Sequence, residues 1–410
     1  MKSIKTGRVL YFLMLFGLIF IFSHCSYQKD FPLILISFDG FRYDYLEKAN
    51  TPNLDYLVNN GVKAKGLIPV FPSKTFPNHF TTVTGLYTEN HGIIANNMYD
   101  PEFDASFSMG NQEAVQDGRW WGGEPIWITA EKQGKTSATY FWPGSEAEYE
   151  GMRATYWKKY DDRVSNTDRV QQILSWLDLP ENERPAFFTL YFSDTDYFGH
   201  RYGPDSPEVV KAITHLDSTM GLLLDGLETR NIKDKVNIII TADHGMTELS
   251  PDRVIFLDDY IDLSTVRIVD WLPVTCIPLD NTNEDEIYNK LKDAHPNFKV
   301  YRKSEIPDRF HYKNHRRVPA IVGIPDEGWS ATSHSYFDSN QNRFVGATHG
   351  YDNTLKSMQG LFVAFGPAFK AGIEVDAFEN VHIYNLMAKT LGLKPAPNDG
   401  DFEIVKEMLR

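Results

Sequence analysis

Four short runs of almost continuous hydrophobic residues are the clearest feature of the sequence. They are LILIS at 33–37, AFFTLYF at 186–192, VNIIIT at 236–241 and LFVAF at 361–365. Such runs are typical of strands that are buried on both faces, as in a parallel sheet covered by helices. We therefore expect these four segments to lie together in one central sheet.

Amphipathic segments separate these runs, and the clearest begins at Ser206-Pro207. Serine is a good N-cap residue, and proline is favoured at the first position of a helix. The hydrophobic positions that follow advance by alternating steps of four and three, which places them on one helix face: Val209, Ile213, Leu216, Met220, Leu223 and Leu227. Strands that alternate with helices predict an α/β fold with a doubly wound, mostly parallel central sheet and helices on both faces.

The pattern of hydrophobic and polar residues changes between about residues 250 and 348. Segments 271–279, 298–302 and 318–324 resemble strands, and segment 283–294 resembles a polar helix. We interpret this stretch as a small α/β insertion within one catalytic domain of residues 30–410. We expect no catalytic residue in the insertion.

The first 25 residues have the pattern of an export signal. Lys2, Lys5 and Arg8 precede an uncharged apolar run at 9–22, which is shorter than the roughly 20 residues of a spanning helix. The run ends in FSHCS, which resembles a bacterial lipobox, although His24 replaces the small residue expected there. A lipid anchor on Cys25, a plain secretory signal and an uncleaved anchor remain open. Each predicts an exported protein, at the periplasm or outer surface.

Composition narrows the classes of function. Of the 410 residues, 42% are hydrophobic, which suffices for a large core, and the formal net charge is -14. This charge argues against binding of a nucleic-acid duplex. The two cysteines, Cys25 and Cys276, provide no disulfide framework if Cys25 is removed or lipidated. We expect a monomer or weak oligomer that needs bound cations to act on an anionic substrate.

Polar residues cluster where the predicted strands end, and ligands of open α/β sheets bind at the carboxyl ends of strands. These residues are Asp39, Asp196, His200, Asp243 and His244, with His349 near the fourth strand. A single Asp-His pair that follows a strand is more often a helix cap or part of a core hydrogen bond. Together, mixed carboxylate and imidazole clusters indicate two Zn²⁺ ions, a common arrangement for displacement at phosphorus.

The candidate nucleophile is Thr75, in the segment FPSKTFPNHF at 71–80. A hydroxyl is a poor nucleophile at neutral pH, and metal coordination can activate it. Alternatively, Ser73 or Thr75 caps a helix that runs toward Thr84, and both roles are compatible because helix N-termini attract phosphoryl groups.

Several motifs resemble the nucleotide pyrophosphatase/phosphodiesterase family, of the alkaline phosphatase superfamily. They are FDGFR at 38–42, PSKTFPNHF at 72–80, HGIIANNMYDP at 91–101, GEPIW at 123–127, FWPGS at 141–145, DYFGHRYGP at 196–204, TADHGM at 241–246, THG at 348–350 and FENVHIYNLM at 378–387. They occur in the family's order, from about residue 32 to the C-terminus. The disulfides and accessory modules of animal members have no counterpart in them.

The resemblance implies a role for each site residue. One zinc ion would be held by Asp39, Thr75, Asp243 and His244, and another by Asp196, His200 and His349. Thr75 would attack phosphorus and water would then hydrolyse the phospho-threonine, while the amide of Asn96 would hold a phosphate oxygen. A nucleotide base would stack between Phe76 and Tyr191 and against Met109, although core packing is an alternative for both aromatic residues.

The resemblance therefore implies a two-zinc phosphodiesterase or nucleotide pyrophosphatase that releases a nucleoside 5′-monophosphate. Lipid or choline phosphodiesters are the alternative substrates. A phosphomonoesterase is disfavoured because we find no arginine near Thr75 or Asn96 in an equivalent place. A surface binding protein without catalysis is the alternative from another class. We assign no role to Lys74, and we expect His79 to face away from Thr75.

Overall fold

The four hydrophobic runs form neighbouring strands of an eight-stranded sheet in the computed structural model, which describes residues 31–279 and 284–410. Across the sheet the order is β19-β2-β18-β9-β1-β8-β6-β7. The four predicted strands are β1 (Leu33–Phe38), β8 (Phe187–Phe192), β9 (Asn237–Thr241) and β18 (Phe362–Phe365). The other four are β2 (Val62–Ala64), β6 (Ser137–Tyr140), β7 (Tyr156–Trp157) and β19 (Ile373–Val375).

The strand directions confirm the predicted fold class. Strand β1 pairs in parallel with both β8 and β9, and β6 continues this parallel arrangement beside β8. Strand β18 runs antiparallel to both of its neighbours, β9 and β2. The sheet is therefore mixed but mostly parallel.

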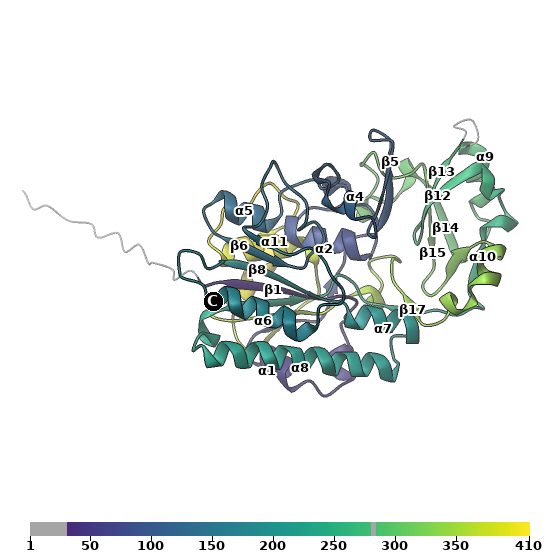
Figure 1. Cartoon of the computed structure of the whole chain (residues 1–410). Coiled ribbons are helices and arrows are strands. Elements are labelled where there is room, and N and C mark those ends of the chain that lie inside the picture. Colours follow the sequence, from purple (N-terminus) through teal and green to yellow (C-terminus); the bar gives the residue numbers. More distant parts are fainter. Residues whose placement is uncertain (1–30, 280–283) are drawn as a thin grey trace, which may run out of the picture. The chain divides into compact units, whose positions relative to one another are not determined.

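Helices cover both faces of this sheet, because successive side chains of a strand point to opposite faces. Leu33 and Leu35 of β1 belong to one buried cluster, and Ile34 and Ile36 to another. The first cluster includes side chains of α2 (Thr75–Thr84), α5 (Ile126–Lys132) and α11 (Ile383–Thr390). The second includes side chains of α1 (Pro52–Asn59), α6 (Asn166–Leu177) and α8 (Pro207–Thr229). The two sets of helices lie on opposite sides of β1 in Figure 1.

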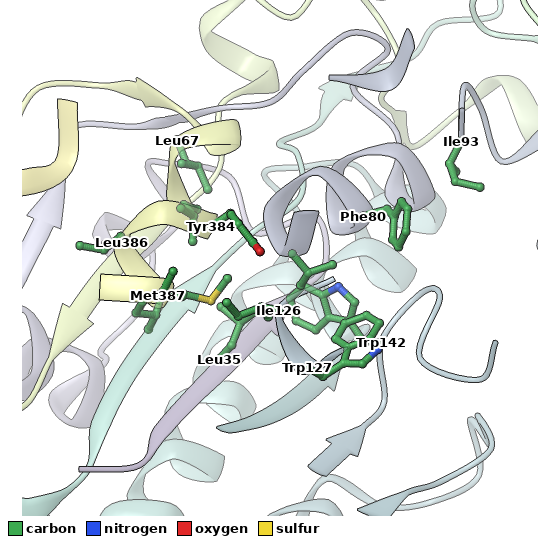
Figure 2. Close-up of a cluster of buried hydrophobic side chains, with 14 of the residues drawn as sticks. Leu35, Leu67, Phe80, Ile93, Ile126, Trp127, Trp142, Tyr384, Leu386 and Met387 are labelled. Carbon is green, nitrogen blue, oxygen red and sulfur yellow. The ribbon is translucent and has the colours of Figure 1, made fainter. Parts of the chain in front are cut away.

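The core on the α2 side is rich in large side chains. In Figure 2, Leu35 of β1 lies among Trp127 of α5, Met387 of α11 and the neighbouring Trp142. These side chains are almost fully buried, and burial of one large apolar side chain contributes roughly 1.5–3 kcal/mol. Phe80 and Val83 of α2 belong to the same cluster, and their packing fixes α2 against the sheet, and with it the position of Thr75.

Helix α8 confirms the predicted amphipathic helix. The Ser206 side chain accepts a hydrogen bond from the backbone N–H of Val209 at 3.3 Å, as an N-cap residue does. All six hydrophobic residues that the periodicity placed on one face are buried.

The stretch predicted as an insertion contains a separate four-stranded antiparallel sheet, in the order β12-β13-β15-β14. Its elements are β12 (Val266–Trp271), β13 (Val274–Pro278), α9 (Glu284–Leu291), β14 (Phe298–Arg302) and β15 (Ile321–Pro325). The predicted strand at 271–279 was wrong at its start. Trp271 ends β12, and Leu272-Pro273 forms the turn into β13, because proline cannot donate to a strand ladder.

Shorter elements complete the described chain. They are β3 (Leu67–Ile68), α3 (Thr88–His91), β4 (Asn97–Asp100), β5 (Ala105–Ser108), α4 (Gln112–Gln116), α7 (Asp194–Tyr202), β10 (Thr247–Glu248), β11 (Val254–Phe256), β16 (Ser330–Thr332), α10 (His334–Ser339), β17 (Ala347–Thr348), β20 (Phe378–Glu379) and α12 (Phe402–Val405). Within residues 31–279 and 284–410, no helix has the length and apolar character needed to cross a bilayer. The predicted signal peptide and Cys25 lie outside the described residues.

Candidate active site

Three adjacent strands deliver acidic residues to one edge of the sheet. Asp39 follows β1 directly, Asp243 follows β9, and Asp196 lies in the first turn of α7, after β8. The backbone N–H of Asp196 donates to the carbonyl of Asp39 at 3.0 Å, and that of Gly40 donates to a carboxylate oxygen of Asp243 at 3.1 Å. Gly40 has a φ of 66°, and a Cβ there would lie 2.9 Å from the Cα of Asp196. A glycine is therefore required for the close approach of these strand ends.

One group of potential ligands surrounds the imidazole of His244. Its Nε2 lies 3.0 Å from Oδ2 of Asp243 and 3.5 Å from Oδ1 of Asp39. The hydroxyl oxygen of Thr75 lies 3.4 Å from the same nitrogen. The structure thus brings together the four residues predicted to share one metal ion.

A second group surrounds Asp196. Its Oδ1 lies 3.3 Å from Nε2 of His200 and 3.7 Å from Nε2 of His349. His200 is four residues further along α7, and His349 follows β17. The imidazoles of His349 and His244 stack with their centroids 3.5 Å apart. The two groups are therefore adjacent, and ligand atoms of Asp39, Asp196 and His244 lie within 4.8 Å of one another.

The three histidines of these groups share one pattern of hydrogen bonds. In each, Nδ1 donates to a backbone carbonyl at 2.9 Å, namely that of Gly245 for His244, Ala347 for His200 and Ser73 for His349. This bond leaves Nε2 as the nitrogen that faces the carboxylates. Metal-ligating histidines are commonly oriented in this way by a partner of the other ring nitrogen.

Each of the three carboxylates has one buried oxygen that accepts no hydrogen bond from the described residues. Among the described residues, no hydrogen bond reaches the buried oxygens Oδ1 of Asp39, Oδ1 of Asp196 and Oδ2 of Asp243. Burial raises the pKa of Asp39 well above its usual value, and the charges of Asp243 and Asp196 raise it further. A buried, unpaired carboxylate is costly unless a cation binds. The donor set and its unpaired oxygens therefore fit bound metal ions.

In the second group, the pKa of Asp196 is lowered and the pKa of His200 is raised. Burial alone would raise the pKa of Asp196, but the neighbouring His200 and His349 lower it to about 2. Burial opposes protonation of His200, but the Asp196 carboxylate raises the pKa of this imidazole to about 9. Asp196 therefore stays ionised and available as a ligand.

Thr75 is the first residue of α2, and its hydroxyl does not serve as a cap. The N-cap residue is Lys74, with extended backbone angles and no side-chain capping hydrogen bond. The hydroxyl of Ser73 donates instead to the carbonyl of Tyr351. The alternative assignment of Ser73 or Thr75 as the helix cap is therefore wrong, since both hydroxyls face other groups.

Asn96 is held by the residue that follows Thr75. The backbone N–H of Phe76 donates to the side-chain oxygen of Asn96 at 3.0 Å. Within the described chain, the amide nitrogen of Asn96 has no hydrogen bond. This arrangement holds the Asn96 side chain against the backbone of the residue next to Thr75 and leaves its NH₂ group available as a donor.

A cavity adjoins Thr75 and contains the three residues predicted to contact a base. Its lining includes Phe76, Met109, Tyr191, Asp39 and Asp196. The ring of Phe76 also packs against Trp121 and Phe107, at centroid distances of 6.0 and 5.9 Å. Phe76 is therefore both a wall of the cavity and part of the core.

Several further walls of this cavity were not predicted as site residues. Phe141 and Tyr160 pack together at a centroid distance of 5.2 Å, and Tyr160 approaches Tyr191 at 6.1 Å. Glu146 and Gln112 add polar groups. Phe141 belongs to a motif that carried the resemblance, but Tyr160 has no local signal in the sequence.

The expectation that His79 faces away from Thr75 was wrong. Residues four apart share one helix face, and Nδ1 of His79 lies 2.9 Å from the Thr75 carbonyl and 3.4 Å from Oδ2 of Asp243. Its Nε2 lies 2.7 Å from the hydroxyl of Ser37. The ring nitrogens of His79 contact Ser37 and the Thr75 carbonyl. His79 therefore differs from the three histidines whose Nε2 faces the carboxylates.

The insertion reaches the site through Lys74, to which we assigned no role. Its ammonium lies 2.7 Å from Oδ1 of Asp270, near the end of β12, and both side chains are almost buried. The insertion is therefore attached to the residue that precedes Thr75.

Comparison with known proteins identifies the family. The model of the family "Type I phosphodiesterase / nucleotide pyrophosphatase" matches residues 33–352. The chain belongs to this family. The family match includes every residue of the two ligand groups as well as Thr75 and Asn96, and it confirms the resemblance found in the motifs.

Similar members of the type I phosphodiesterase family come from animals. A venom phosphodiesterase of Crotalus durissus collilineatus is 44% identical over 390 residues, which cover 92% of this chain and 46% of the venom protein. Human ectonucleotide pyrophosphatase/phosphodiesterase family member 5 is 39% identical over 377 residues, with 92% and 78% covered. The chain thus spans about half the length of the venom phosphodiesterases that it matches.

A solved structure of the family has the same fold. Murine ectonucleotide pyrophosphatase/phosphodiesterase 5, in an inactive threonine-to-alanine variant in complex with AMP, superposes with a TM-score of 0.88 at 39% identity. The match covers 92% of this chain and all of the murine chain.

Proposed function

We propose that this protein is a two-zinc nucleotide phosphodiesterase and pyrophosphatase that releases nucleoside 5′-monophosphates. One observation carries the proposal. Thr75 lines a cavity with aromatic walls, and its hydroxyl contacts His244 in a cluster of carboxylates that each keep one buried oxygen without a hydrogen bond from the described residues. The relatives named phosphodiesterase and pyrophosphatase, and the AMP complex of the murine relative, support it.

Asp39, Asp243, His244 and Thr75 would hold one ion, and Asp196, His200 and His349 the other. Mixed carboxylate and imidazole ligands suit zinc, whereas Mg²⁺ and Ca²⁺ prefer oxygen ligands. Bound zinc supplies Lewis acidity, which lowers the pKa of a coordinated hydroxyl and neutralises charge at phosphorus.

Thr75 is the nucleophile in this mechanism. Its oxygen forms a bond to phosphorus while the bond from phosphorus to the leaving oxygen breaks, and the electron pair stays on that oxygen. Water then cleaves the threonine ester, and the nucleoside monophosphate departs. Helix α2 holds the hydroxyl at the cluster throughout, because its buried face is fixed in the core.

Asn96 binds a non-bridging phosphate oxygen through its free NH₂ group. The bond from the Phe76 N–H fixes the amide in the orientation that presents these donors. A neutral donor suits a diester, which carries less charge than a phosphate monoester dianion. The neutral Asn96 donor therefore distinguishes the proposed reaction from phosphomonoester hydrolysis.

The base of the nucleotide occupies the cavity between Phe76 and Tyr191. Aromatic pairs with offset or edge contacts contribute about 0.5–1.5 kcal/mol beyond the area that they bury. Met109, which is about half exposed, lines the same cavity. Aromatic walls can stack on a planar base, and they can also hold a quaternary ammonium group. Lipid or choline diesters therefore remain the second candidate substrates.

Two substrates with the same chromophore separate these candidates. The purified, zinc-loaded protein is assayed on the p-nitrophenyl ester of a nucleoside 5′-phosphate and on p-nitrophenyl phosphocholine. The proposal predicts a higher kcat/KM for the nucleoside ester, with the nucleoside monophosphate as product. A preference for the choline ester would transfer the assignment to the second candidate, and no hydrolysis of either would favour a binding protein.

We further propose that the protein is exported. The proposal is supported only by the sequence of the first 25 residues. Fractionation of cells that produce the full chain tests it, because a cytoplasmic location of the active protein would refute it.

A further inference from the structure

The segment that carries Asn96 lies between α3 and β4 and has no regular structure. None of residues 92–96, all of which the structure describes, belongs to a helix or a strand. Residues 93–95 are buried. Because these residues lack the backbone hydrogen bonds of a helix or a strand, contacts with other parts of the chain must fix their position. We call residues 92–96 the Asn96 segment.

Tyr312 of the insertion holds the middle of the Asn96 segment. Its hydroxyl donates to the carbonyl of Ile94, two residues before Asn96, at 3.1 Å. The side chain is fully buried, and its ring packs edge-on against Phe71 with the centroids 5.2 Å apart. Phe71 lies four residues before Thr75. Tyr312 therefore contacts both the segment that leads to the proposed nucleophile and the segment that carries Asn96.

Arg317, also from the insertion, joins the two sides of Asn96. Its Nη1 donates to the carbonyl of Gly92 and to that of Trp120, both at 2.7 Å, and its Nε donates to the carboxylate of Asp100 at 2.6 Å. Gly92 begins the Asn96 segment, and Asp100 ends β4, four residues beyond Asn96. The guanidinium group is planar, and its donors have a fixed geometry. Arg317 therefore sets the distance between the two residues that flank Asn96.

Asp100 provides Arg317 with a fixed partner. The Asp100 side chain is buried, and it also accepts two hydrogen bonds from Arg316, at 3.0 and 2.8 Å. The backbone N–H groups of Glu102 and Phe103 donate to the same carboxylate at 2.9 and 3.3 Å. A buried carboxylate with such partners is compensated, and the loss of one charged partner is costly. These contacts therefore confine the Arg317 guanidinium to one position.

The contacts around Gly92 show how closely the insertion approaches the Asn96 segment. Gly92 has a φ of 77°, and a Cβ there would lie 2.7 Å from Nε2 of His315 and 3.0 Å from Nη1 of Arg317. A larger residue would displace these side chains and strain the backbone. The insertion is thus in direct contact with the backbone at the start of the Asn96 segment.

We propose that Tyr312 and Arg317 are positioning residues, through which the insertion holds Asn96 in place for catalysis. The inference rests on the proposed function, in which the Asn96 amide binds a non-bridging phosphate oxygen. The bond from the Phe76 N–H orients the amide, whereas Tyr312 and Arg317 fix the backbone that carries it. A donor to phosphate acts fully only at the correct place, so a small displacement lowers the rate of the chemical step.

Two substitutions in the insertion test this role, with the zinc-loaded protein and the p-nitrophenyl ester of adenosine 5′-phosphate. Tyr312→Phe removes the bond to Ile94 and keeps the ring. We expect kcat to fall about fivefold, as for the loss of one neutral hydrogen bond, with little change in KM. Arg317→Lys keeps the charge but cannot reach all partners of the guanidinium group. Here we expect a fall of about tenfold, because bonds from charged donors are stronger.

The same two substitutions in an Asn96→Ala background separate positioning from general stability. Without the amide there is nothing left to position, so neither Tyr312→Phe nor Arg317→Lys should lower kcat further in that background. An equal loss of kcat with and without Asn96 would show that these residues act independently of Asn96. Unchanged kcat in both single variants would show that Asn96 needs no support from the insertion. Either result overturns the proposal.

Tyr288→Phe is the matched control. It removes the hydroxyl of another buried tyrosine of the insertion, which donates to Glu305 at 2.7 Å. We expect kcat of this variant to stay unchanged, and a loss equal to that of Tyr312→Phe would show general weakening of the insertion and refute the positioning role. Full kcat in Asn96→Ala itself would instead refute the proposed function of Asn96, and the positioning role with it.

Discussion

The ammonium group of Lys74 lies 2.7 Å from the carboxylate of Asp270, and this buried ion pair joins the segment before Thr75 to the insertion. Removal of one partner leaves the other charge buried and unpaired, which typically costs about 3–5 kcal/mol. We expect Asp270→Asn to lower the free energy of unfolding by about 3 kcal/mol, measured by urea denaturation.

The double variant Lys74→Met with Asp270→Leu is the matched control, because it removes both charges and keeps most of the volume. It should be more stable than Asp270→Asn. A double variant that loses as much stability as the sum of the single variants would show that the two side chains are not energetically coupled.

Substitution of Thr75 tests the nucleophile. Thr75→Ala should reduce kcat to the background of the assay, because the attacking oxygen is absent, while the melting temperature stays close to that of the wild type. Thr75→Ser keeps a hydroxyl at the same place and should retain measurable turnover. Activity of Thr75→Ala equal to that of Thr75→Ser would remove this residue from the mechanism.

Two variants of Asn96 distinguish a structural role of this residue from a catalytic role. Asn96→Asp keeps the oxygen that accepts from Phe76 N–H, but it lacks the NH₂ donors and adds a negative charge near phosphate. We expect kcat to fall at least about 100-fold in this variant, in line with the loss of one oxyanion donor, and Asn96→Ala to lose somewhat less. If Asn96→Asp remains fully active while Asn96→Ala does not, the residue has only a structural function.

Metal removal should affect both activity and stability. Because the unpaired carboxylate oxygens of Asp39, Asp196 and Asp243 need a cation, dialysis against a strong chelator should abolish hydrolysis and lower the melting temperature. Ligand binding to the folded state stabilises it in proportion to the logarithm of the ligand concentration above Kd. Zinc should restore both properties and magnesium should not. Full activity in protein shown by elemental analysis to be metal-free would contradict the scheme.

The sequence identified the strands that carry the site because they are buried on both faces, and this burial leaves continuous hydrophobic runs. The positions of Asp39, Asp243 and His244 follow from the ends of those strands. Strand β12 was missed at 266–270 because Arg267 and Asp270 interrupt its apolar residues, and the mostly apolar residues 272–278 then suggested one longer strand.

Contacts between segments that are far apart in the sequence could not be predicted from local sequence patterns. Lys74 and Asp270 lie 196 positions apart, and neither has a local signal that indicates its partner. His79 could have been placed correctly, because its spacing of four from Thr75 puts both residues on one helix face. Its hydrogen bond to Ser37 of β1 depends on how α2 packs on the sheet.

A buried histidine outside the ligand groups predicts how stability depends on pH. Burial, together with the charges of His315 and Arg317, lowers the pKa of His91 from 6.5 to about 3. The unfolded chain therefore binds a proton below pH 6.5 that the folded protein does not bind, and stability falls as the pH decreases from 6.5 toward 3. For this one group the loss is about 1.4 kcal/mol at one pH unit below 6.5.

The His91→Gln variant isolates this contribution. It keeps a polar side chain near Thr81, whose hydroxyl lies 2.9 Å from Nε2 of His91, but it cannot titrate. Its free energy of unfolding, measured between pH 7 and pH 5, should depend less steeply on pH than that of the wild type. Parallel curves for the two proteins would exclude His91 as the source.

The central claim is that residues from separate strands hold two zinc ions around the hydroxyl of Thr75. Anomalous diffraction at the zinc absorption edge, from crystals of protein that is active in solution, tests it most directly. We expect two peaks, the first within bonding distance of Asp39, Thr75, Asp243 and His244, and the second within bonding distance of Asp196, His200 and His349. Maps without anomalous peaks at these residues, from protein that hydrolyses the nucleoside ester, would contradict it.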